Sequence, residues 1–385
     1  MICGAGSDEP TLIDTCEPTV FPMLPAPNTS ASPWPHRWAV LLAATTFPLI
    51  WVGGLVTTYE AGMAVPDWPT TYGYNLFLYP WQTWLFGPFD LFIEHGHRLL
   101  GAAVGMLTIG LLVAVWRIDG RPWMRWLSLA ALAAVIFQGV LGGMRVLLDE
   151  RLLAKIHGCF GPAFFALCAS LAVVTSRWWH TATAAVVEGP ERRFRSLALL
   201  TVLLTYGQIV LGAQLRHVSL TLSAGGFRIL VLFHLLVAVV LLAVVSLLFI
   251  RALRLLPRPV QLVRPAVGLA VLVGVQWLLG LGTWIVNFGW PAWTGGYAMS
   301  EAFVIPHASW QQALVTTAHV AVGSAILATS VVLAVRTVRL YRPIAAAATI
   351  APDSQRPAEA ENSNSRRGSM WRQVQVRLPQ EGLTA

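Results

Sequence analysis

Residues 227–250 read FRILVLFHLLVAVVLLAVVSLLFI, and this stretch decides the fold class. It contains one arginine, one histidine and one serine, and every other residue is apolar. At about 1.5 Å per residue, a helix of this length crosses the roughly 30 Å hydrocarbon core of a bilayer. A helix also satisfies its own backbone hydrogen bonds in lipid. The stretch therefore predicts a transmembrane helix.

Seven further apolar runs of similar length occur along the 385 residues. Hydrophobic residues make up 56% of the chain and charged residues 11%, with a mean hydropathy of +0.63, which excludes an ordinary soluble domain. We therefore predict an all-α, polytopic membrane protein with eight transmembrane helices. The predicted spans are 38–56, 92–116, 123–146, 153–176, 196–218, 227–250, 265–287 and 313–336.

The net charge of +8 raises the question of nucleic-acid binding. Most of the 26 Lys and Arg residues fall in the connections after even-numbered helices and in the tail, on one side of the membrane. This asymmetry follows the positive-inside rule. It predicts a multi-pass protein of the bacterial cytoplasmic (inner) membrane, with both termini in the cytoplasm, lipid as its surroundings and no nucleic-acid partner.

The chain ends differ in composition from the apolar runs. Residues 1–37 predict a cytoplasmic, disordered leader, and residues 337–385 a cytoplasmic, disordered tail rich in small and polar residues. Between them we expect two repeated four-helix bundles, 38–176 and 196–336, joined by a cytoplasmic linker at 177–195.

Repeated motifs support this division. Three odd-numbered helices carry a glutamine followed four residues later by a glycine, and the first helix keeps only the glycine. The pairs are Gln138 and Gly142, Gln208 and Gly212, and Gln276 and Gly280, with Gly53 in the first helix.

Each even-numbered helix carries a histidine near its predicted outer end, followed four residues later by a small residue. These histidines are His97, His157, His234 and His319. A single membrane histidine usually forms a hydrogen bond between helices, but four at one depth in repeated positions favour ligands.

Haem suits this pattern better than a single ion. Zinc and copper sites usually gather their ligands around one metal, often with thiolate or carboxylate, whereas histidine is an axial ligand of haem iron. A small residue one turn from the histidine would leave room for a porphyrin. Two histidines per bundle predict one bis-histidine site in each, with arginines near the outer side as partners of the propionates. The candidate arginines are Arg98, Arg145, Arg216 and Arg228.

The segment Glu94-His95-Gly96-His97-Arg98 matches the Glu-x-x-His-Arg motif of the haem A synthase family, and Pro66-Asp67-Trp68-Pro69 resembles that family's first outer loop. The order of the other histidines also fits. The sequence departs from many bacterial members because residues 57–91 contain no cysteine pair. His95 is a rival to His97, since residues two apart on a helix point about 200° apart and only one can face the core.

The resemblance implies oxidation of a porphyrin methyl group of haem O to a formyl group, which gives haem A for cytochrome oxidase. It implies that His97 and His157 flank the substrate haem O, while His234 and His319 ligate a haem b cofactor. It also makes haem O synthase and cytochrome oxidase assembly proteins the candidate protein partners.

Glu94 is the candidate acid-base group, because it precedes His97 by three residues and shares its helical face. The alternative reading is an acid in the first helical turn, favoured by the helix dipole. Three other functions stay open: a di-haem membrane b-type cytochrome that relays electrons, a non-enzymatic haem carrier or assembly factor, and a transporter with histidine proton relays.

Overall fold

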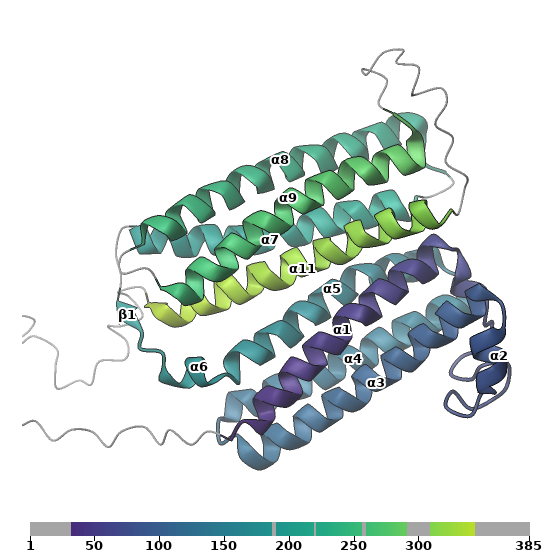
Figure 1. Ribbon diagram of the computed structural model, residues 1–385, viewed down its shortest axis with the longest axis horizontal. Helices are drawn as coiled ribbons and strands as arrows, with labels where there is room; N and C mark the ends of the chain where they lie inside the picture. Colours follow the sequence, from purple (N-terminus) through teal and green to yellow (C-terminus); the bar gives the residue numbers. More distant parts are fainter. Residues whose placement is uncertain (1–31, 187–189, 219–220, 256–258, 291–308, 343–385) are drawn as a thin grey trace, which may run out of the picture.

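A computed structural model of the protein describes residues 32–186, 190–218, 221–255, 259–290 and 309–342 (Figure 1). Within these residues, eight helices are long and apolar enough to cross a membrane, so the prediction of an all-α, multi-pass membrane protein is confirmed. They are α1 (Trp34–Thr58), α3 (Phe89–Ile118), α4 (Pro122–Leu148), α5 (Arg151–Val174), α7 (Pro190–Arg216), α8 (Ala224–Arg254), α9 (Val260–Phe288) and α11 (Trp310–Leu340).

Short elements lie between the long helices. They are the 3₁₀ helix η1 (Ala61–Met63), α2 (Trp81–Phe86), α6 (Arg177–Thr181) and two strands of two residues each, β1 (Ala185–Val186) and β2 (Tyr341–Arg342). The predicted linker 177–195 contains α6 and β1. Because β1 pairs in parallel with β2, the linker contacts the chain directly after α11. The expected leader and tail lie mostly outside the described residues, although α1 begins at Trp34 and α11 continues to Leu340, inside the ranges assigned to them.

Several helices begin two or three residues before the predicted start. The Ser223 hydroxyl accepts a hydrogen bond from the Gly226 backbone, and the Ser309 hydroxyl accepts one from the Gln312 backbone. Such N-caps satisfy backbone N–H groups of the first turn, so polar residues extend the helix beyond its apolar run. The earlier start of α3 at Phe89 puts Asp90 in its first turn and Glu94 beyond it.

The helices form two groups that pack around separate cores. Helices α1, α3, α4 and α5 contact one another, as do α7, α8, α9 and α11 (Figure 1). The largest fully buried side chains of the first group include Leu111, Met124 and Leu171, and those of the second include Leu248 and Leu262. The division into two repeated bundles at 38–176 and 196–336 stays a prediction.

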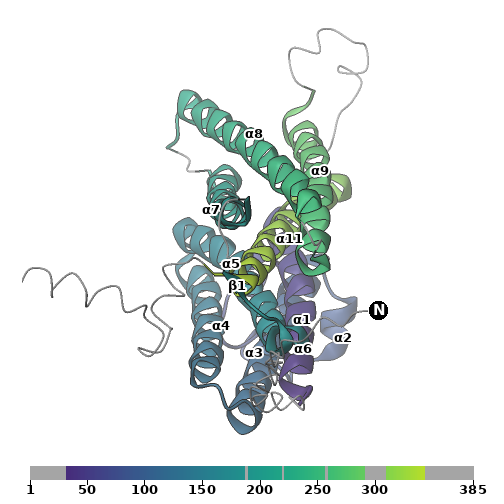
Figure 2. The same cartoon turned by 90° about the vertical axis from the view of Figure 1, so that its left-hand side faces the viewer.

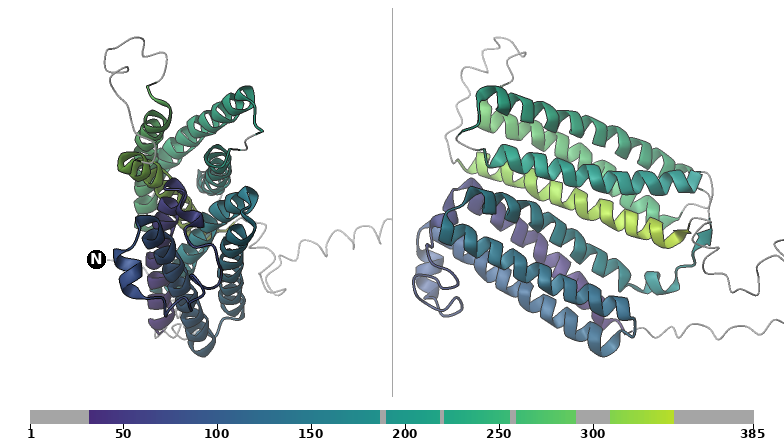
Figure 3. Two further views of the ribbon diagram at one scale, coloured as in Figure 1. Left: turned by 90° about the vertical axis from the view of Figure 1, so that its right-hand side faces the viewer. Right: turned by 180° about the vertical axis from the view of Figure 1, so that it is seen from behind.

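The groups meet where α11 of the second group packs against α1 and α5 of the first (Figures 2 and 3). Small residues allow close approach there. A methyl group at Gly54 of α1 would stand 2.8 Å from the Thr317 side chain of α11. The Arg216 guanidinium reaches across from α7 and donates to the Gly54 carbonyl and the Thr58 hydroxyl of α1, both at 2.7 Å.

Candidate functional site: two histidine pairs and a capped carboxylate

The first histidine pair lies in the group that begins with α1. His97 of α3 and His157 of α5 face each other, with ring centroids 6.4 Å apart. Each ring lies against a glycine of a neighbouring helix. A methyl group at Gly53 would stand 2.7 Å from the His97 Cε1 atom, and one at Gly142 would stand 3.0 Å from the His157 Cε1 atom. The glycines therefore hold open the space that the two rings fill.

The second pair repeats this arrangement in the other group. His234 of α8 and His319 of α11 have ring centroids 6.5 Å apart. A methyl group at Gly212 would stand 3.4 Å from the His234 Cε1 atom, and one at Gly280 would stand 3.2 Å from that of His319. The structure thus brings the four predicted histidines together as two pairs, each within one helix group.

The pair geometry fits a bis-histidine haem. Two imidazoles bound to opposite sides of one iron have ring centres about 6 Å apart, since a metal–nitrogen bond is about 2 Å and each nitrogen lies about 1 Å from its ring centre. All four histidines are half-buried. No group of three or more His, Cys, Asp or Glu side chains that could hold a single metal ion occurs in the described ranges.

An unpaired polar atom points to the same conclusion. The buried Nδ1 atom of His234 has no hydrogen-bond partner among the described residues. His157 Nδ1 lies 3.2 Å from the Gln138 carbonyl oxygen, and the rings of His97 and His319 face the backbone carbonyl groups of Leu49 and Gln276. Buried polar atoms without partners are rare in folded proteins and call for an explanation. A ligand held between the rings would fix their orientation and their tautomer.

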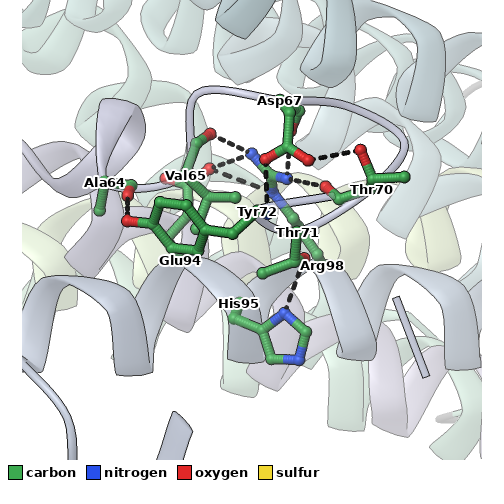
Figure 4. A network of polar contacts seen from close by, with 9 residues as sticks. All are labelled: Ala64, Val65, Asp67, Thr70, Thr71, Tyr72, Glu94, His95 and Arg98. Carbon is green, nitrogen blue, oxygen red and sulfur yellow. Dashed lines mark hydrogen bonds and ion pairs between the residues drawn. The ribbon is translucent and has the colours of Figure 1, made fainter. Parts of the chain in front are cut away.

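His95 does not compete with His97 for this position. His95 is 2% exposed, and its Nδ1 atom lies 3.0 Å from the Thr71 hydroxyl (Figure 4). Its ring packs against Tyr79 and Trp84. These partners belong to the outer loop and α2, which cover the amino-terminal end of α3 (Figure 1). His95 therefore packs against the outer loop and α2, whereas His97 faces the interior of the helix group.

Glu94 lies buried beneath that loop, with 4% of its surface exposed. Its Oε1 atom accepts from Arg98 Nη2 at 3.0 Å and from Nε at 3.3 Å, while Oε2 has no partner in the described structure. Since Glu94 lies beyond the first turn of α3, the alternative reading as a helix-dipole acid loses its basis. One carboxylate oxygen thus remains available one helical turn from His97.

Arg98 binds the outer loop in the structure. Its guanidinium donates to the backbone carbonyl groups of Val65, Asp67 and Thr70, at 2.7 to 2.9 Å, as well as to Glu94 (Figure 4). The planar fork of arginine suits such a set of acceptors. These contacts support a clamp on the outer loop, and they leave the expected propionate contact without support.

Asp67 stabilises the same loop by hydrogen bonds within it. Its carboxylate accepts from the backbone N–H groups of Tyr72 and Gly73, both at 2.8 Å, and from the Thr70 hydroxyl. Gly73 has a φ of 78°, a conformation that glycine adopts without strain. The Pro-Asp-Trp-Pro segment therefore orders a turn whose carbonyl groups face Arg98.

The other candidate arginines lie in three different settings. Arg145 pairs with none of the described residues and lines a cavity of about 160 Å³ at the outer ends of α1, α4 and α5. Arg216 is taken up by its bonds to α1. Arg228 is exposed at the start of α8.

The sequence reasoning missed His217 and gave the three glutamines no role. His217 lines the Arg145 cavity, and only its position directly after Arg216 could have drawn attention to it. Each glutamine donates its side-chain amide to the backbone carbonyl of the histidine on the next long helix: Gln138 to His157 at 3.0 Å, Gln208 to His234 at 2.9 Å, and Gln276 to His319 at 3.0 Å.

Known proteins share this sequence pattern. Residues 36–305 match the COX15-CtaA family model, described as cytochrome oxidase assembly protein. The match includes three of the histidine helices and ends before α11, which carries His319. Relatives named heme A synthase come from Shouchella clausii (27% identical over 198 residues), Alkalihalophilus pseudofirmus (24% over 193) and Symbiobacterium thermophilum (27% over 201).

These alignments cover 49 to 50% of this chain, and they span 62% of the length of each relative. The family model itself matches well over half of the chain. The chain therefore belongs to this family of cytochrome oxidase assembly proteins, the haem A synthase family that its motifs predicted.

Proposed function

We propose that this protein is an oxidoreductase, a haem A synthase that oxidises a porphyrin methyl group of haem O to a formyl group. One asymmetry supports this proposal above all. A buried carboxylate, Glu94, lies one turn from the first histidine pair, whereas α8, α9 and α11 around the second pair contain no Asp or Glu. An acid near only one of two haem sites fits a reaction at that site and a bound cofactor at the other.

The histidines divide accordingly. His97 and His157 flank the substrate haem O, and His234 and His319 ligate haem b. Conversion of a methyl to a formyl group removes four electrons and four protons and adds one oxygen atom, which water would supply. Haem b held by His234 and His319 would pass the electrons on to an external oxidant. The two groups contact each other through α1, α5 and α11, so a route for electrons between the pairs would run through protein.

Glu94 acts as the proton acceptor in this proposal. Arg98 holds Oε1 and fixes the carboxylate, while Oε2 keeps its lone pairs free. The loop that Arg98 binds lies over Glu94 (Figure 4), so the carboxylate is shielded from bulk solvent. Fixed orientation and exclusion of water favour transfer of a proton to a positioned base.

Arg145 is the arginine best placed to meet a haem propionate. It lines the cavity together with Glu60, Asp149 and Glu150, and among the described residues its guanidinium forms no ion pair or hydrogen bond that would occupy it. A guanidinium matches the geometry of a carboxylate. Arg216 joins the two helix groups instead, and exposed Arg228 would reach a propionate only at the rim of the second pair.

The finer organisation is part of the same proposal. Residues 38–176 form the substrate-haem unit and residues 196–336 the haem b unit, in the bacterial cytoplasmic membrane with both termini in the cytoplasm. The arginine distribution supports this orientation. A haem O synthase would supply the substrate, and cytochrome oxidase assembly proteins would receive the product.

Expression in bacteria that make haem O but lack their own haem A synthase tests the activity. We expect the purified protein to carry haem b and haem A, identified by mass after extraction, and the membranes to accumulate haem A. An inactive control is the His97→Ala variant. Two b-type haems without any haem A would support the electron-relay function instead and refute the synthase proposal.

A further inference from the structure

Two of the three glutamine amides lie beside the glycine that follows the histidine. The histidine carbonyl that accepts each glutamine amide lies one turn before the small residue. A methyl group at Gly161 would stand 3.4 Å from Gln138 Nε2, and one at Gly323 would stand 3.3 Å from Gln276 Nε2. In α5 and α11 the glycine therefore lies directly beside the glutamine amide.

His97 is the exception among the four. The position on α1 that corresponds to the glutamines, four residues before Gly53, is Leu49, which has no amide to donate. The glycine after His97, Gly101, keeps the space, because a methyl group there would meet no atom within 4 Å. There is thus space beside Gly101 of α3 for a glutamine amide, but α1 carries a leucine where that glutamine would be.

This asymmetry separates the two pairs. His234 and His319 are both held at their backbone by a glutamine, whereas in the first pair only His157 is held. A side-chain bond from a neighbouring helix fixes the height and rotation of the histidine relative to that helix. A histidine without this bond can shift along its helix axis at a lower cost.

We propose that the three glutamines are positioning residues that fix axial histidines at their backbone, and that Leu49, which has no amide, leaves the His97 backbone less firmly held as haem enters and leaves. This inference rests on the proposed function, in which the first pair exchanges substrate for product and the second pair retains its cofactor. A site that exchanges its haem needs one histidine that can move away, whereas a site that retains its haem needs none.

Haem transfer to excess apomyoglobin measures the exchange directly. The full-length protein in detergent is loaded with iron protoporphyrin IX, and the transfer rate is followed by absorbance. Two phases are expected, and a His234→Ala background isolates the first pair while a His97→Ala background isolates the second. In the His97→Ala background, Gln276→Leu should accelerate loss by about threefold or more, the effect of one interhelical hydrogen bond on an equilibrium.

The decisive variant adds a bond. In the His234→Ala background, Leu49→Gln should slow haem loss by about threefold or more, and the matched control Leu49→Met, which has no donor, should not. A misfolded variant would lose haem faster, so slower loss cannot arise from damage. Equal rates for Leu49→Gln and Leu49→Met would overturn the inference with the proposed function intact. A protein that takes up no haem at either pair would refute both.

Discussion

The ring of His97 lies so close to Gly53 that a methyl group on Gly53 would stand 2.7 Å from the His97 Cε1 atom. The same distance is 3.0 Å for Gly142 and His157 and grows to 3.4 Å for Gly212 and His234. Real Cβ atoms essentially never approach another atom within 3.0 Å, so the requirement for glycine is strictest beside His97. The four glycines thus differ in how closely each approaches the histidine that we propose as a ligand.

Gly53→Ala should displace the His97 ring and weaken haem binding at the first pair by about tenfold, because overpacking at a tight contact costs about 1 to 3 kcal/mol. Haem content per chain and the low-spin absorbance spectrum measure the loss. Gly212→Ala is the matched control, since the gap at His234 already accommodates a methyl group. Equal haem content in both variants would contradict the packing argument.

Glu94→Gln should retain haem and lose conversion of haem O by about 100-fold or more, the usual contribution of a positioned acid or base. Glutamine keeps the size of the side chain and its contact with Arg98, but it does not take up a proton at neutral pH. Haem O or a partly oxidised intermediate should accumulate on the protein, as detected by mass after extraction.

The matched control for Glu94 is Asp90→Asn, on the same helix. Asp90 is exposed in the first turn of α3 and bonds to the adjacent Leu91 backbone. This change should leave conversion unaffected. Normal haem A production by Glu94→Gln in cells without another copy would exclude Glu94 as the catalytic base.

Replacement of His234 or His319 by alanine should remove the low-spin b-type haem signal while the protein still inserts in the membrane, because the loss acts at the iron and not on helix hydropathy. Optical spectra and extracted haem b measure this effect. His36→Ala is a suitable control, since His36 lies near Thr175 at the other end of the helices. Unchanged spectra in both ligand variants would rule out the second site.

Acid should loosen the outer loop through Asp67. Desolvation raises the pKa of Asp67, but hydrogen bonds from the Gly73 backbone, the Thr70 hydroxyl and the Tyr72 backbone outweigh it, so the pKa lies below the ordinary value of 3.8. Because the folded value is the lower one, the stabilisation is complete above the ordinary pKa and is lost as the pH falls through the folded value.

Hydrogen exchange at the Tyr72 and Gly73 amides, corrected for intrinsic rates, measures this change. Protection should persist at pH 5 and above and decline in more acidic solution. In Asp67→Asn the protection should be weaker throughout and should no longer follow a carboxylate titration. A wild-type loop that stays equally protected at all acidities would show that Asp67 does not hold the turn.

Much of the architecture follows from composition along the chain. Apolar runs such as 227–250 predict helices because hydrocarbon thickness sets their length, and the structure extends this run only to Ala224–Arg254. The predicted order of histidine helices was also right, because spacing along one helix needs no knowledge of its neighbours. The capping residues, which lie outside the apolar runs, account for the missed starts.

The sequence by itself determined the eight spans, the histidine positions and the family. Only the tertiary structure decided that His97 faces His157 while His95 faces the outer loop, and that Arg98 binds loop carbonyl groups while Arg145 lines a cavity. Helical periodicity fixes the angle between two side chains on one helix. It does not fix which of them meets a neighbouring helix, because that depends on how segments distant in sequence fold over it.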